Sequence, residues 1–107
     1  MSVLNDLYGV VMSRKTEPQE GSYTCYLFEK GTDKICKKVG EEAAETIIAA
    51  KNGDNDELKN EIADLLYHVC VLAADRGLDI TEVEDVLRER SNKIGNLKQF
   101  HVSDHNT

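Results

Sequence analysis

GEEAAETIIAAKNGDNDELKNEIADLLYHVCVLAA, residues 40–74, decides the fold of this chain. An apolar pattern of helical period lies on each side of the polar turn NGDND, which predicts two helices joined as a hairpin. The second helix is apolar on nearly every side over residues 62–74, so we expect it to be central in the fold. Glutamates crowd beside both apolar faces, although like charges three or four residues apart destabilise an exposed helix by about 0.2–0.5 kcal/mol per pair. We therefore expect a cation close to them.

Composition fits a single cytoplasmic domain. The chain has 107 residues, with 20 acidic against 13 basic side chains and a formal net charge of −7. An acidic chain without a basic stripe is a poor partner for nucleic acid. The three cysteines show no C-x-x-C spacing, which is typical of reduced thiols. The N-terminal residues lack a signal-peptide pattern and no apolar run approaches about 18 residues, so we expect neither secretion nor a membrane.

Caps and breakers place about five helices and leave almost no strand signal. The third and fourth begin at Thr32 or Asp33 and at Asp54, and the last begins at Asp79 with a capping-box pattern to Glu82. We expect one all-α domain over residues 1–95, with a core like that of a four-helix bundle completed by dimerisation, and a loose tail over 96–107. The expected helical ranges are residues 3–15, 22–31, 32–51, 54–76 and 79–94.

The acidic side chains of the hairpin form two stripes. Glu42 and Glu45 lie one turn apart on its first helix, and Glu61 and Asp64 lie one turn apart on its second, with His68 on the same sector. These stripes are positioned to face each other across the hairpin, and we expect Asp64 to be partly buried. A partly buried carboxylate cluster requires a cation.

The donor set indicates which cation this is. Two carboxylate pairs, E-x-x-E and E-x-x-D, offer oxygen ligands only, which suits Mg²⁺ or Mn²⁺. A di-iron bundle would need a Glu-x-x-His motif on two helices. The DND run at residues 54–56 is no calcium loop, because Lys59 stands at the position of the required glycine. The alternative is that both acidic stripes are solvated helix faces.

Residues 22–78 resemble the phosphoribosyl-ATP pyrophosphatase family, which belongs to the MazG-like group of all-α nucleoside triphosphate pyrophosphatases. The resemblance rests on five segments in order: Ser-Tyr-Thr at 22–24, a Lys-Gly turn at 30–31, Lys-Val-Gly-Glu-Glu-Ala-x-Glu at 38–45, Glu-x-x-Asp-Leu-x-Tyr-His at 61–68, and Arg-Gly-Leu at 76–78. It implies Mg²⁺-dependent hydrolysis of phosphoribosyl-ATP to phosphoribosyl-AMP and pyrophosphate, the second step of histidine biosynthesis.

The resemblance also implies site residues and partners. It makes Glu42, Glu45, Glu61 and Asp64 the metal ligands, the same four that the helical positions indicate. It implies a homodimer. The cyclohydrolase of the next pathway step is often fused to this enzyme, but the chain has no room for it, so we expect a separate protein.

The implied reaction suggests roles for neighbouring residues. Lys38, on the flank of Glu42, is the favoured phosphate contact, with an ordinary Lys38/Glu42 helix pair as the alternative; Lys34 and Lys30 are further candidates. Glu41 is either the base for the attacking water or a solvated side chain. His68 either contacts substrate or is a hydrogen-bonded structural residue.

Two other functions fit the same acidic motif. The chain could hydrolyse ordinary ribo- or deoxyribonucleoside triphosphates as a housecleaning pyrophosphatase, and only the segments at 22–24 and 38–40 argue for the histidine pathway. It could also be a non-enzymatic helical interaction module that a metal stabilises.

Overall fold

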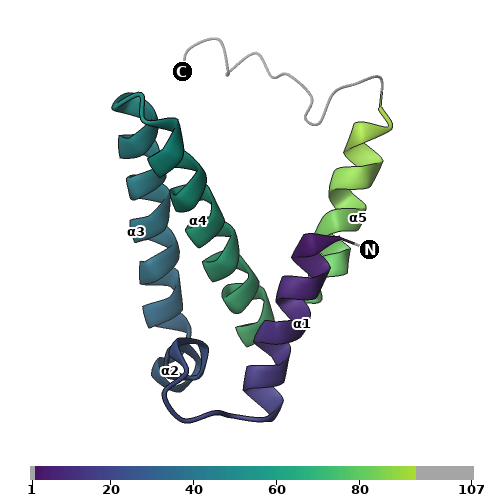
Figure 1. Cartoon of the computed structure of the whole chain (residues 1–107). Helices are drawn as coiled ribbons and strands as arrows, with labels where there is room; N and C mark the ends of the chain where they lie inside the picture. The colour runs from purple at the N-terminus through teal and green to yellow at the C-terminus, as the bar shows by residue number, and fades with distance from the viewer. Residues whose placement is uncertain (1, 94–107) are drawn as a thin grey trace.

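The computed structural model describes residues 2–93, and every element in that range is an α-helix (Figure 1). The predicted all-α class is confirmed. The predicted tail over residues 96–107 lies outside the described residues. The five helices are α1 (Val3–Thr16), α2 (Tyr23–Lys30), α3 (Thr32–Lys51), α4 (Asn55–Asp75) and α5 (Ile80–Ser91).

Helix starts agree with the sequence at Ser22, Asp54 and Asp79 and differ at α3. The Ser22 hydroxyl accepts a hydrogen bond from the N–H of Cys25, and the Asp54 carboxylate accepts one from the N–H of Glu57. Asp79 caps α5 as predicted, although its carboxylate accepts the N–H of Thr81 at 2.9 Å rather than that of Glu82. The predicted cap of α3 at Thr32 or Asp33 is wrong, because Gly31, at φ 94°, ends α2 and begins α3.

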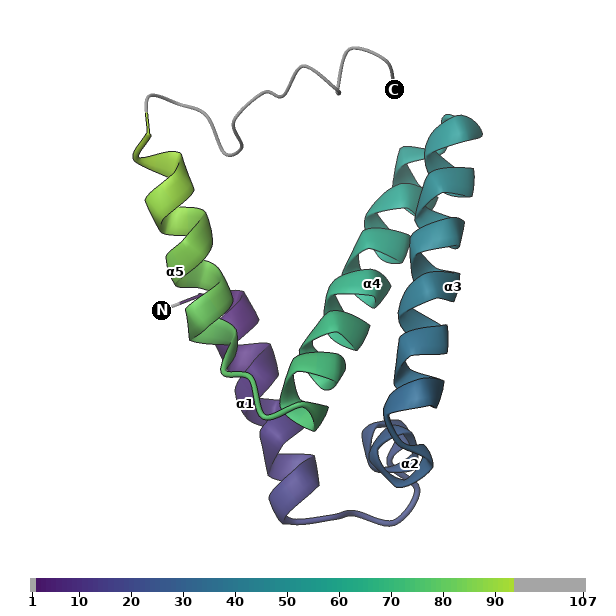
Figure 2. The ribbon, with the colours of Figure 1, turned by 180° about the vertical axis from the view of Figure 1, so that it is seen from behind.

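The helices form two arms that diverge from a common apex (Figures 1 and 2). The hairpin of α3 and α4 forms one arm, α1 and α5 form the other, and the short α2 lies beside the start of α3. The radius of gyration, 16.0 Å, exceeds the ~13 Å expected of a compact domain of this length. The described part of one chain therefore does not close into a bundle by itself.

The hydrophobic core lies at the apex, where α4 contacts the other four helices. Burial follows from this arrangement: the C-terminal half of α4 is surrounded, whereas its N-terminal half packs against α3 alone. The prediction that α4 is central therefore holds for the C-terminal half, while Ile62 and Leu66 are exposed. The core residues are Val11, Leu27, Ile35, Cys70, Val71, Ala73, Ala74 and Ile80.

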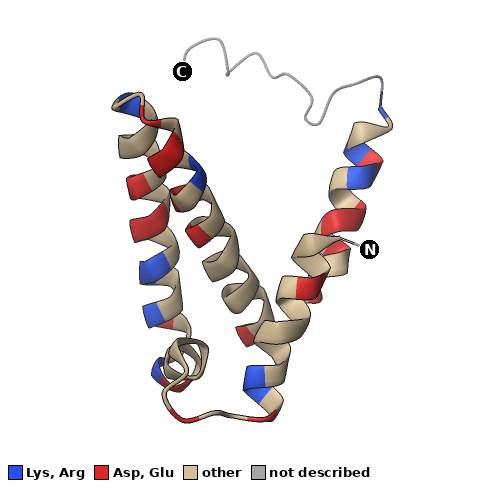
Figure 3. Ribbon diagram, in the orientation of Figure 1, with Lys and Arg blue, Asp and Glu red and all other residues tan. Residues whose placement is uncertain are grey.

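Charged residues are unevenly distributed along the hairpin arm. Figure 3 shows acidic and basic residues along α3 and along the N-terminal half of α4, whereas residues 65–74 of α4 include no Asp, Glu, Lys or Arg. The acidic residues of the hairpin therefore lie outside the stretch of α4 that forms the core. Among residues 2–93, no helix is long and apolar enough to cross a membrane.

Candidate metal and phosphate site

Three carboxylates meet between α3 and α4. Oxygen atoms of Glu42, Glu45 and Glu61 all lie within 4.8 Å of one another. The antiparallel hairpin produces this arrangement, because residues one turn apart on each helix share the face that contacts the partner helix. The two acidic stripes thus face each other as the helical positions indicate.

Burial makes this cluster unfavourable without a cation. Glu42 is only 7% exposed, and its Oε2 atom and that of Glu61 have no hydrogen-bond partner. Burial, followed by the negative charge of Glu45, raises the pKa of Glu42. A hydrogen bond with Glu45, followed by burial, raises the pKa of Glu61 to about 7. Unpaired buried oxygens with crowded negative charge are the chemical environment that a divalent cation relieves.

Asp64 lies at the edge of this cluster rather than inside it. Its side chain is exposed, so the expectation of partial burial is wrong. The physical reason is that α3 alone covers this part of α4. Asp64 is nevertheless close enough for its charge to contribute to the raised pKa values of Glu42 and Glu61.

His68 is 5% exposed and both of its ring nitrogens are hydrogen-bonded. Nδ1 lies 2.7 Å from the backbone oxygen of Asp64, and because a carbonyl only accepts, Nδ1 carries the hydrogen. In the neutral imidazole Nε2 then accepts from the Tyr23 hydroxyl, 3.0 Å away. This supports the structural interpretation of His68. The sequence pattern alone indicates no role for Tyr23, although the residue lies in the Ser-Tyr-Thr segment at 22–24.

The lysines lie along one side of the cluster. Lys38 Nζ is 3.4 Å from Oε1 of Glu41 and 3.7 Å from Oε1 of Glu42, so the predicted ion pair with Glu42 is present at the rim of the carboxylates. Glu41 is exposed and its carboxylate is outside the three-residue cluster. Lys34 is half-buried near the start of α3, and Lys30 Nζ is 5.7 Å from the centre of the Tyr26 ring.

Comparison with known proteins decides the family. The model of the family described as phosphoribosyl-ATP pyrophosphohydrolase (PRA-PH) matches residues 4–91. The chain belongs to this family. It is 52% identical over 103 residues to the phosphoribosyl-ATP pyrophosphatase of Streptococcus sanguinis, covering 96% of this chain and 99% of that protein.

Two further phosphoribosyl-ATP pyrophosphatases show the same relationship. The Streptococcus gordonii protein is 56% identical over 91 residues, 85% of this chain and 88% of its own length. The Listeria monocytogenes protein is 52% identical over 96 residues, which cover 90% of this chain and 92% of that protein. Membership in the PRA-PH family confirms the resemblance seen in residues 22–78 and the predicted enzyme class, a pyrophosphate-releasing hydrolase.

The raised pKa of Glu61 predicts how stability depends on pH when no metal is bound. The folded state holds this proton up to about pH 7, while the unfolded chain releases it near 4.5. The folded state therefore binds more protons between these values, and the free energy of unfolding falls as pH rises through this window. In EDTA, as the pH rises from 4.5 to about 7, we expect the melting temperature of the wild type to fall more steeply than that of Glu61→Gln.

Glu57→Gln is the matched control, because Glu57 is exposed on the same helix and outside the cluster. It should reproduce the wild-type pH dependence. Identical slopes for wild type and Glu61→Gln would show that Glu61 titrates as an ordinary carboxyl group.

Proposed function

We propose that the chain hydrolyses phosphoribosyl-ATP between its α- and β-phosphates, releasing phosphoribosyl-AMP and pyrophosphate in the second step of histidine biosynthesis. One observation carries the proposal: in a member of the PRA-PH family, the buried oxygens of Glu42 and Glu61 have no hydrogen-bond partner within a three-carboxylate cluster. Carboxylates without a cation repel a triphosphate. A metal ion bound between the carboxylates and the triphosphate would offset this repulsion.

The residues of the cluster fit Mg²⁺, or Mn²⁺. Glu42, Glu45 and Glu61 supply oxygen donors within 4.8 Å of one another, and Asp64 adds a carboxylate one turn beyond Glu61. Hard oxygen donors are the ligands these ions prefer. When bound, the ion offsets negative charge on the triphosphate and on the departing pyrophosphate.

Neighbouring side chains bind and orient the reactants. Lys38 lies at the rim, where a phosphate oxygen can replace its partner Glu41, and Lys34 and Lys30 extend the positive charge toward α2. Glu41, exposed next to Lys38, is the candidate base for the attacking water, with a solvated side chain as the alternative. His68 acts on the substrate only through Tyr23, because its two ring nitrogens are hydrogen-bonded to the Tyr23 hydroxyl and to the backbone oxygen of Asp64.

The assembly follows from what a single chain leaves uncovered. Ile47 is 63% exposed, and Ile48, Ile62 and Leu66 are also exposed on the hairpin arm. Burial of such side chains contributes about 25 cal/mol per Å² of apolar surface, which favours a homodimer in which the hairpins of two copies cover each other. The product would then pass to a separate cyclohydrolase in the cytoplasm.

Removal of the metal or of one ligand should abolish activity. We expect pyrophosphate release from phosphoribosyl-ATP to require Mg²⁺ or Mn²⁺ and to stop in EDTA. Glu45→Gln and Asp64→Asn should each lower the rate about 10²- to 10³-fold, the range for loss of one electrostatic stabiliser, while remaining folded. Glu57→Gln is the control. Full turnover in either ligand variant would exclude the site, and preference for dCTP or dUTP would indicate a housecleaning pyrophosphatase.

Lys38→Ala distinguishes a phosphate contact from a surface ion pair. A contact that strengthens as charge moves onto pyrophosphate predicts that kcat and kcat/KM fall together, about 10²- to 10³-fold. An ion pair alone predicts a stability change of at most about 0.5 kcal/mol and unchanged kinetics. Steady-state kinetics should therefore separate Lys38→Ala from Lys37→Ala, an exposed neighbour on the same helix.

Light scattering tests the assembly. At micromolar concentration the measured mass should be about twice the chain mass of 12.0 kDa. Ile47→Asp should shift the mass toward that of one chain, because a carboxylate would be buried in the shared apolar surface. A wild-type protein that stays monomeric at high concentration would contradict the dimer.

A further inference from the structure

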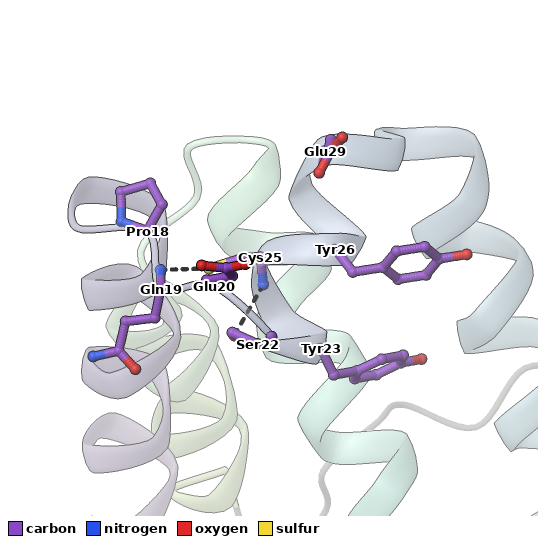
Figure 4. A pocket seen from close by; sticks show the side chains of 9 residues that line it. Pro18, Gln19, Glu20, Ser22, Tyr23, Cys25, Tyr26 and Glu29 are labelled. Atoms are coloured by element: carbon purple, nitrogen blue, oxygen red, sulfur yellow. Dashed lines mark hydrogen bonds between the residues drawn. The ribbon is translucent and has the colours of Figure 1, made fainter.

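Two tyrosines of α2 form an exposed aromatic surface. The ring centres of Tyr23 and Tyr26 are 6.1 Å apart with 24° between the ring planes. Both rings extend to the same side of α2, away from Pro18 and Gln19 in the preceding loop (Figure 4). They are 45% and 41% exposed, although large aromatic side chains usually bury most of their surface.

Two residues of α4, Tyr67 and His68, fix the position of the Tyr23 side chain. Its hydroxyl donates to His68 Nε2, and its ring lies 6.3 Å from that of Tyr67 with 29° between the planes. The Tyr67 hydroxyl in turn hydrogen-bonds Thr24. The exposed ring surface is therefore preorganised, which lowers the entropy lost when a ligand binds.

This surface adjoins the carboxylate site. His68 links Tyr23 to the backbone oxygen of Asp64 through two hydrogen bonds. Burial raises the pKa of the Tyr23 hydroxyl, and both Lys38 and Glu42 are near enough to act on it. At the other end, Lys30 Nζ lies 5.7 Å from the Tyr26 ring centre, so positive charge flanks the rings.

The exposed faces of these rings are open to a ligand. A neighbouring hollow of about 610 Å³ lies on the side of α2 from which the rings extend away, and it is lined by residues 18–22, Tyr23, Cys25, Tyr26 and Glu29. A planar, partly apolar group is the part of a nucleotide that suits aromatic rings, whereas its phosphates suit a cation and lysines.

We propose that Tyr23 and Tyr26 bind the purine base of the nucleotide by stacking, while its triphosphate lies at the carboxylate site. The inference rests on the proposed function and adds to it the group that recognises the base. Lys30, at the Tyr26 end, then faces the ribosyl phosphate that distinguishes phosphoribosyl-ATP from ATP. Tyr23 and Tyr26 are binding residues, because they contact the base and not the bond that breaks.

The test compares two ligands, one that has a purine base and one that has only phosphates. The probes are α,β-methylene-ATP, whose α–β bridge cannot be hydrolysed, and inorganic tripolyphosphate, each titrated calorimetrically in Mg²⁺. If the base stacks on the Tyr26 ring, Tyr26→Ala should lower the affinity for α,β-methylene-ATP about 5- to 100-fold. The affinity for tripolyphosphate should change by less than about twofold. Tyr26→Phe keeps the ring and should bind both probes like wild type.

Three results would overturn the proposal. Unchanged binding of α,β-methylene-ATP by Tyr26→Ala would place the base elsewhere. Equal weakening of both probes would mean that the substitution disturbs the whole site. A change in the mass of Tyr26→Ala by light scattering, with nucleotide binding intact, would assign the rings to contact between two copies of the chain.

Kinetics separate this inference from the reaction itself. Because the base contact is the same in the ground and transition states, Tyr26→Ala should raise KM for phosphoribosyl-ATP and leave kcat within about twofold. Pyrophosphate release by wild type without any effect of Tyr26→Ala on KM would overturn the base site alone. Tyrosine-dependent binding of α,β-methylene-ATP without pyrophosphate release would support the base site and contradict the reaction.

Discussion

Repulsion among carboxylates is the constraint on which the rest of this molecule depends. Glu42, Glu45 and Glu61 are held within 4.8 Å of one another, and two of their oxygens are buried without a hydrogen-bond partner. No helix gains stability from such a cluster, because desolvation and like charge both favour the neutral acids. The structure must therefore hold α3 against α4 by contacts elsewhere. The core at the apex, where Ile35 and Val71 are fully buried, provides them.

The separation of the hydrophobic core from the carboxylate cluster accounts for the open arrangement of the helices. The apex supplies apolar packing from all five helices, while the hairpin arm presents charged groups and leaves Ile47 and Ile62 uncovered. The proposed triphosphate site has to admit a large, highly charged ligand, and the open hairpin arm leaves room for it. The separation also lets the site carry unfavourable electrostatics without placing them inside the core that stabilises the fold.

Sequence periodicity predicted the parts that depend on one or two helices. The hairpin and the meeting of Glu42 with Glu61 follow from residues repeating every turn on two helices joined by a short connection. The exposure of Asp64 could not be predicted in this way, because it depends on how many other helices cover that part of α4. The hydrogen bond from Tyr23 to His68 joins residues 45 positions apart, and no local pattern encodes it.

Gly31 joins the two halves of the proposed nucleotide site. It ends α2 and begins α3 at φ 94° and ψ −178°, a backbone conformation essentially confined to glycine, and a Cβ added there would meet no other atom within 4 Å. The tyrosines lie on one side of this residue and the glutamates on the other. One pair of backbone dihedral angles therefore sets the direction of the aromatic rings relative to the carboxylates of α3. Any other residue here would be strained at these angles, so a substitution at Gly31 would favour a different angle between α2 and α3 while every contacting side chain stayed the same.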